Sequence, residues 1–255
     1  MTYKFKISAI AITSLLLSAS AFAGNEDRVG QSGANELIIN PWVRSAGWMN
    51  CNTSSVRGLE AQYLNVAGTA FAKKTEIGFT HTNWLKGTGI SINSFGITQH
   101  VGESGALTLG IMSMDFGNIE ITTPESPEGG IGTYKPQFLN VGLSYAKAFS
   151  NSIYGGLTIK IISESVADVR ASGIAFDAGI QYVTGFNKEK DNLRFGIALK
   201  NVGAPLNFKG DGLASKGFTS DQTSLTISQR AERFELPSLV NIGAAYDFKF
   251  LEMHR

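Results

Sequence analysis

The sequence predicts an all-β fold, a transmembrane antiparallel β-barrel, on three observations. Apolar residues alternate with small or polar residues along several runs after residue 74, as they do when successive strand side chains point to opposite faces. The runs are about ten to thirteen residues long, against five or six in soluble domains and about nine to eleven in a tilted membrane strand. Short turns also alternate with connections that are mostly longer, which is typical of outer-membrane barrels.

The clearest alternation lies between Gln137 and Asn201, in four consecutive runs. Their other face is small or polar and carries Lys160, Asp177 and Arg194 beside many glycines. Because a soluble β-sandwich alternates in the same way, this pattern alone does not distinguish water from a bilayer. The residues that we expect to face lipid are Leu143, Tyr145, Leu157, Ile159 and Ile197. We expect Leu143→Arg to be costly and a polar change at Ser144 to be tolerated.

The N-terminus predicts export. Lys4 and Lys6 precede the apolar residues 7–17, and Ala21-Phe22-Ala23 forms a small-x-small cleavage site, so residues 1–23 are expected to be a signal peptide cleaved after Ala23. The chain of 255 residues is 17% charged with a net charge of +1, which gives no basic field for nucleic acid. The one cysteine, Cys51, cannot form an internal disulfide.

Residues 24–73 are expected to form a periplasmic leader followed by a short helical or plug segment. Residues 24–37 have no periodicity and predict a mobile leader, whereas residues 58–71 read as short helical pieces with Leu59 and Tyr63 on one face. We favour packing under a barrel mouth over anchoring at a membrane interface. The candidates for lining the lumen or plugging it are Tyr63, Asn65, Gly68 and Phe71.

Residues 74–255 are expected to form the barrel. The strands are predicted over 75–84, 89–101, 106–116, the four runs within 137–201, and 240–250, with a further one at 225–229. The apolar phase switches within 89–101 and 106–116, which indicates a β-bulge or a position covered on both sides. Eight or nine strands without a long closing strand predict either a small closed barrel or, as we favour, an incomplete one.

The connections at 118–136, 163–172 and 202–237 are predicted to be extracellular loops, with the N-terminus in the periplasm. Binding residues are usually found on loops held by a rigid scaffold. The candidates for partner binding are Glu120, Pro124, Glu128, Tyr134, Lys209, Asp211 and Phe218.

Nothing in the sequence predicts catalysis, a metal site or a cofactor. His81, His100 and His254 are far apart and have no metal-ligand spacing. The acidic loop with Glu120 and Glu128 fits no EF-hand, so a solvated surface is the better interpretation.

Four separated blocks resemble one family: residues 40–48 (NPWVRSAGW), 58–71 (GLEAQYLNVAGTAF), 80–84 (THTNW) and 173–179 (GIAFDAG). They are similar to the PorV/PorQ family of Bacteroidota, outer-membrane barrels related in fold to the FadL long-chain fatty-acid channels. The family usually carries Asn-Pro-Ala-Gly near the first strand, whereas this chain has Asn65-Val66-Ala67-Gly68. The family's barrel has fourteen strands, so the resemblance implies that eight or nine of about fourteen are present.

The resemblance implies a non-enzymatic part in type IX secretion. The implied partners are proteins of the type IX secretion translocon and attachment complex, the C-terminal signal domains of cargo, and outer-membrane lipid. A PorV-like role is favoured over a PorQ-like one. Two alternatives stay open: a FadL-like channel for hydrophobic small molecules, and a soluble periplasmic or surface β-protein with a structural role.

Overall fold

The computed structural model describes residues 30, 32–185, 191–218 and 224–248. The chain divides into two units, Met1–Gln31 and Ser32–Arg255. Only Gly30 of the first unit is described, and every described helix and strand lies in the second unit. The predicted signal peptide with its cleavage site, His254, and the end of the last predicted strand lie outside the described residues.

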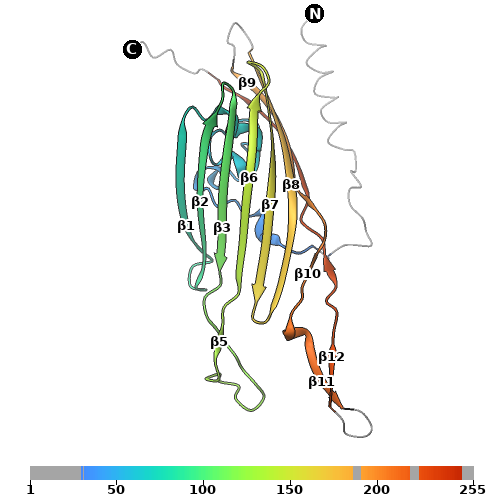
Figure 1. The fold of residues 1–255 in the computed structure, drawn as a ribbon. Helices are drawn as coiled ribbons and strands as arrows, with labels where there is room; N and C mark the ends of the chain where they lie inside the picture. Colours follow the sequence, from blue (N-terminus) through green and yellow to red (C-terminus); the bar gives the residue numbers. More distant parts are fainter. Residues whose placement is uncertain (1–29, 31, 186–190, 219–223, 249–255) are drawn as a thin grey trace, which may run out of the picture. The chain divides into compact units, whose positions relative to one another are not determined.

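The central element is one eight-stranded antiparallel sheet in which each strand pairs with the next long strand along the chain (Figure 1). Its strands are β1 (Thr75–Trp84), β2 (Ile90–Val101), β3 (Gly105–Asp115), β6 (Gln137–Ala148), β7 (Ile153–Val166), β8 (Val169–Thr184), β9 (Leu193–Gly203) and β14 (Leu239–Tyr246). The all-β prediction is confirmed, and the eight long strands lie where the alternation predicts them. Within the described residues the sheet is open, because β1 and β14 are its two edges.

Within the described residues, four short helices precede the sheet: η2 (Asn35–Ile38), α2 (Val43–Gly47), α3 (Ala61–Leu64) and η3 (Val66–Phe71). The last two confirm the helical pieces predicted at residues 58–71. The expectation of a mobile leader is wrong for Ala34–Leu37, because Leu37 packs in a buried cluster with Ile162 and Leu206. We call residues 32–72 the plug segment.

Two long connections carry small hairpins of their own. β4 (Ile119–Glu120) pairs with β5 (Thr133–Tyr134), β10 (Leu206–Asn207) pairs with β13 (Arg233–Phe234), and β11 (Ala214–Phe218) pairs with β12 (Ser224–Ser228) after η4 (Asp211–Leu213). The strand predicted at 225–229 therefore exists, but as part of a separate hairpin and not as a ninth strand of the sheet.

The loop predicted at 163–172 is wrong. β7 and β8 continue into it and leave only Ala167 and Asp168 between them, with Ala167 in the left-handed region at φ 48°. The polar residues Ser163, Glu164 and Ser172, which suggest a loop in the sequence, pair across this hairpin. Short and long connections therefore mix at this end of the sheet.

The phase switches in β2 and β3 are not bulges, because both strands keep an unbroken register. The other explanation, cover on both sides of the strands, is confirmed for one side only: Ile92 and Met112 are buried under the plug segment, whereas Phe95 and Leu109 are exposed on the other face. A bulge occurs instead between β8 and β9, at Phe176/Ala178.

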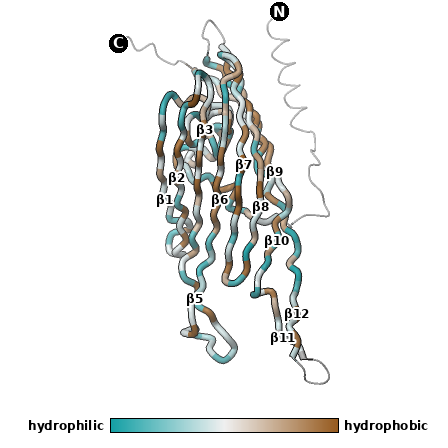
Figure 2. The backbone as a smooth tube through the Cα atoms, in the orientation of Figure 1, coloured by the Kyte–Doolittle hydropathy of each residue, from teal (hydrophilic) through white to brown (hydrophobic). Residues whose placement is uncertain are grey.

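The two faces of the sheet differ in polarity and in exposure, and Figure 2 shows the alternation as bands along the strands. On the face away from the plug segment, apolar side chains are exposed: Leu157 is 66% exposed, Ile197 53% and Ile242 78%. On the face that the plug segment covers, which we call the inner face, polar residues such as Thr108, Ser144 and Thr158 are buried. Among the described helices, none is long and apolar enough to cross a membrane.

Candidate functional site

The candidate site is the inner face of the sheet together with the plug segment that packs on it. Gly78, Gly96, Gly110 and Gly142 are directly opposite one another across β1, β2, β3 and β6. A methyl group added at Gly78 or Gly96 would lie 2.8 Å or 2.7 Å from a carbon of Leu59. Because real side-chain atoms do not approach so closely, this row of glycines is what allows the plug segment to lie against the strands.

A second contact of the same kind lies on the last two strands. Gly196 on β9 is opposite Gly243 on β14. A methyl group at Gly196 would lie 2.6 Å from the Ser54 Cα and from the Thr53 carbonyl oxygen, both backbone atoms. The plug segment therefore contacts the sheet directly through its backbone at this position.

Gln62 attaches the plug segment to β3 and β6. Its Nε2 lies 2.9 Å from the Gly142 carbonyl oxygen and donates to Ser144 Oγ at 2.7 Å. Ser144 also lies 2.9 Å from Thr158 Oγ1 and is 1% exposed. Ser144 is therefore part of a buried network and does not face water, so a larger polar side chain there is now expected to be costly.

Asn65 attaches the plug segment to the other half of the sheet. Its Nδ2 donates to the carbonyl oxygens of Thr53 at 3.0 Å and Ile180 at 3.1 Å, while its Oδ1 accepts from the Ala67 N–H at 3.2 Å. Gln181 on β8 adds bonds to the carbonyl oxygens of Thr53 and Val56. These amides satisfy backbone groups of the plug segment that have no secondary-structure partner.

The other predicted plug residues also lie at this interface. A methyl group at Gly68 would lie 2.2 Å from the Val56 carbonyl oxygen, so the chain passes close there. The Phe71 ring stacks on Tyr154 with centroids 4.0 Å apart, and the Arg57 guanidinium lies 4.3 Å from the Phe71 centroid. This stack holds the end of the plug segment against β7.

Two charged residues of the inner face, Lys160 and Asp177, form a buried pair. Lys160 Nζ lies 2.5 Å from Asp177 Oδ2 and donates to Asn201 Oδ1 at 2.8 Å. Asn201 is the bulge residue of β9, with φ 58°, and its backbone N–H donates to Asp177 Oδ1 at 2.7 Å. The bulge thus turns a backbone donor toward the carboxylate, which helps to offset the cost of burying both charges.

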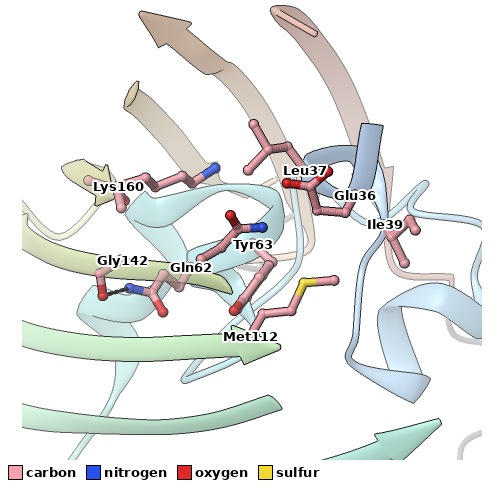
Figure 3. Close-up of a pocket in the computed structure, with 10 residues that line it drawn as sticks. Glu36, Leu37, Ile39, Gln62, Tyr63, Met112, Gly142 and Lys160 are labelled. Carbon is pink, nitrogen blue, oxygen red and sulfur yellow. Dashed lines mark hydrogen bonds between the residues drawn. The ribbon is translucent and has the colours of Figure 1, made fainter. Parts of the chain in front are cut away.

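Tyr63 borders a small cavity on the inner face that also contacts Glu36, Met112 and Lys160 (Figure 3). The Tyr63 ring packs edge-on against Trp42, with centroids 6.5 Å apart. Burial raises the pKa of the Tyr63 phenol to about 12, while the Ser94 hydroxyl 3.5 Å away acts in the opposite direction. The phenol is therefore neutral at any physiological pH.

The predicted partner-binding residues lie on the two long connections and are not brought together into one site. Glu120 is in β4, Tyr134 in β5, and Pro124 and Glu128 lie exposed between them. The others lie on the second connection: Lys209 and Asp211 are exposed, and Phe218 ends β11. Among the described residues, no group of three or more His, Cys, Asp or Glu side chains is arranged to hold a metal ion.

The residues predicted to face lipid share the exposed outer face. Leu143 and Tyr145 are each 50% exposed, Leu157 and Ile159 are exposed opposite them on β7, and Ile197 is exposed further along the sheet on β9. The sequence analysis did not name Gln62, Gln181 or Glu36 as candidate site residues. Gln181 lies on the polar side of an alternating run, which was a usable signal, whereas Gln62 and Glu36 belong to short helices without a clear period.

Comparison with known proteins finds a similar solved structure but no matching sequence family. No family model matches the chain, and no curated protein matches it. A solved structure described as a TodX deltaS2S3 mutant monoaromatic hydrocarbon channel is similar over 77% of this chain, with 11% identity and a TM-score of 0.45. The match spans 64% of that channel's length.

Proposed function

We propose that this chain is a non-enzymatic outer-membrane β-barrel protein whose inner face is filled by its plug segment and whose long connections bind a protein partner. The observation that carries the proposal is the outer face of the sheet, where exposed apolar side chains recur on every strand. Exposed apolar surface of this extent is unstable in water and marks a membrane or an interface.

Strand length supports the bilayer as the environment of this face. The eight strands have 8 to 16 residues, and all but β14 reach the length that a tilted strand needs to cross a bilayer. An unpaired strand edge in hydrocarbon is costly. The proposal therefore requires that the outer edges of β1 and β14 be paired in the membrane, by further strands or by another chain.

The finer part of the proposal is a role in type IX secretion, as a PorV-like barrel. Its support is the resemblance of the four sequence blocks and the two hairpin-bearing connections, which extend from one end of the sheet (Figure 1). The partners would be translocon and attachment-complex proteins or the C-terminal signal domain of cargo.

Photo-crosslinking in the native host tests the partner. A benzophenone amino acid at Glu128, exposed on the first long connection, is expected to crosslink to secretion-system proteins or cargo. The matched control places the same amino acid at Leu157, on the exposed outer face, where crosslinks to protein should be absent. If the amino acid at Glu128 crosslinks to no secretion-system or cargo protein, the partner assignment is refuted, while the membrane assignment is unaffected.

A second function, a channel for hydrophobic small molecules, is favoured by one feature of the inner face. Ile92, Met112 and Met114 form an apolar cluster there, against which Ile39 and Tyr63 pack. A hydrophobic molecule that co-purifies with the protein, and is lost when Met112→Trp fills this region, would support the channel over the secretion role.

A further inference from the structure

A second pocket on the inner face, of about 320 Å³, lies between η2 and the ends of β3, β6 and β7. Five apolar residues contribute to its lining: Ala34, Ile39, Met114, Phe116 and Phe138. The rings of Phe116 and Phe138 meet edge to face with centroids 4.9 Å apart. The volume is within the range of small-molecule sites, which are also mostly apolar with a few convergent polar groups.

Two carboxylates also border this pocket, Glu36 from η2 and Glu164 from β7. The register places Glu164 near a third acceptor: Glu164 is opposite Phe138, and Asn140 follows two residues later on the same face of β6. Glu36 and Asn140 both border the adjoining cavity that Figure 3 shows. The three acceptor side chains therefore come from three different elements.

These acceptors are buried and have oxygens without partners. Glu36 is 3% exposed, Glu164 5% and Asn140 6%. Oε1 of Glu164 and Oδ1 of Asn140 have no hydrogen-bond partner within the described part of the chain, and the Glu36 carboxylate interacts only with its own backbone and the Asn140 side chain, neither of which carries a positive charge. Buried charges are normally paired, so this arrangement has unused capacity for a positively charged donor.

The lysine that borders the adjoining cavity does not supply that charge. Lys160 borders the cavity beside Glu36, but its ammonium is held by Asp177 and Asn201. Burial first, and then the negative charge of Glu164, raise the pKa of the Glu36 carboxyl to about 7. The raised pKa agrees with a carboxylate that lacks a counter-charge.

We propose that Glu36, Glu164 and Asn140 bind the ammonium group of a small primary amine whose apolar body lies against Met114, Phe116 and Phe138. An alkylammonium has three N–H donors, one for each acceptor side chain. A hydrated metal ion fits less well, because its waters would face the apolar walls without partners. The site is independent of the proposed secretion role.

The test uses the full chain, purified in a neutral detergent, and calorimetric titration with 2-phenylethylammonium. Binding is expected at pH 8, and 2-phenylethanol, which has the same shape without the charge, should bind at least tenfold more weakly. Glu36→Gln should weaken amine binding at least tenfold, whereas Glu103→Gln, in the exposed turn between β2 and β3, should leave it unchanged. Glu36→Gln removes an unpaired buried charge, so its folding is not expected to suffer.

Three results would overturn the proposal: no amine binding, equal binding of the alcohol, or Ca²⁺ that binds and displaces the amine. A pH series adds a separate check. Because Glu36 must ionise to hold the cation while the amine stays protonated, affinity should rise from pH 6 to pH 8 in the native chain and stay flat in Glu36→Gln. The same rise in both proteins would mean that another group is responsible.

Discussion

Gly196→Ala tests the contact between the plug segment and the sheet most sharply. The added methyl group would lie 2.6 Å from the Ser54 Cα and the Thr53 carbonyl oxygen, so the plug backbone would have to move by about 0.8 Å to reach the ordinary contact distance of 3.4 Å. Overpacking of this kind costs about 1–3 kcal/mol. The loss of unfolded-chain freedom with alanine offsets roughly 0.4–1 kcal/mol of that cost.

The matched control is Gly243→Ala. This residue is directly opposite Gly196 on the neighbouring strand, but its methyl group would lie 3.4 Å from Ser54 N and from Thr53 Cβ, an acceptable distance. Gly243→Ala should therefore be as stable as the native protein, or slightly more stable. We expect the two variants to differ by about 1–3 kcal/mol in unfolding free energy.

The assay is urea unfolding of protein refolded into bilayers, followed by tryptophan fluorescence and by trypsin cleavage after the exposed Arg57 of the plug segment. Gly196→Ala should unfold at lower urea and cleave faster, while Gly243→Ala should match the native chain. Equal stability and equal cleavage of both variants would refute the packing of the plug backbone on β9.

The two faces of the sheet lead to three further predictions. Leu143→Arg should destabilise the protein in bilayers by about 2–4 kcal/mol, and Leu143→Ala should cost much less; equal losses in a refolding titration would contradict lipid contact. Folding raises the pKa of Glu36 to about 7, so the unfolding free energy of the native protein should fall as pH rises from about 5 to 7. Glu36→Gln should remove up to roughly 3 kcal/mol of this fall, as measured by urea midpoints across the pH range. An unchanged pH profile in Glu36→Gln would contradict the buried unpaired charge. Lys160→Met should cost about 3–5 kcal/mol by leaving Asp177 unpaired, and adding Asp177→Leu should recover part of the loss; strict additivity in the double-mutant cycle would show that the pair does not interact.

The sheet was predictable from the sequence because its signal is local and repeats every two residues. Leu143 and Ser144 illustrate this, since adjacent positions fall on opposite faces without any knowledge of the neighbouring strands. The hairpin at Ala167 and Asp168 was mispredicted because polar residues near a turn suggest a loop, although in this chain they continue the strand pairing. Polarity alone does not mark where a ladder ends.

The inner-face site was predictable only in part. Tyr63 was identified from helical spacing and Asn65 was also a plug candidate, but their partners were not, because Ile180 and Ser94 are far away in sequence. The unpaired carboxylates of Glu36 and Glu164 depend on a long-range meeting of η2 with β7. Nothing in the residues around either glutamate indicates it.

Contact between the outer face and hydrocarbon is the central claim, and nitroxide scanning tests it most directly. A spin label at Leu157, in a Cys51→Ser chain inserted into bilayers, should collide more often with oxygen than with a water-soluble nickel complex, and a label at the exposed loop residue Glu128 should show the reverse. Equal nickel accessibility at Leu157 and Glu128 would contradict the claim.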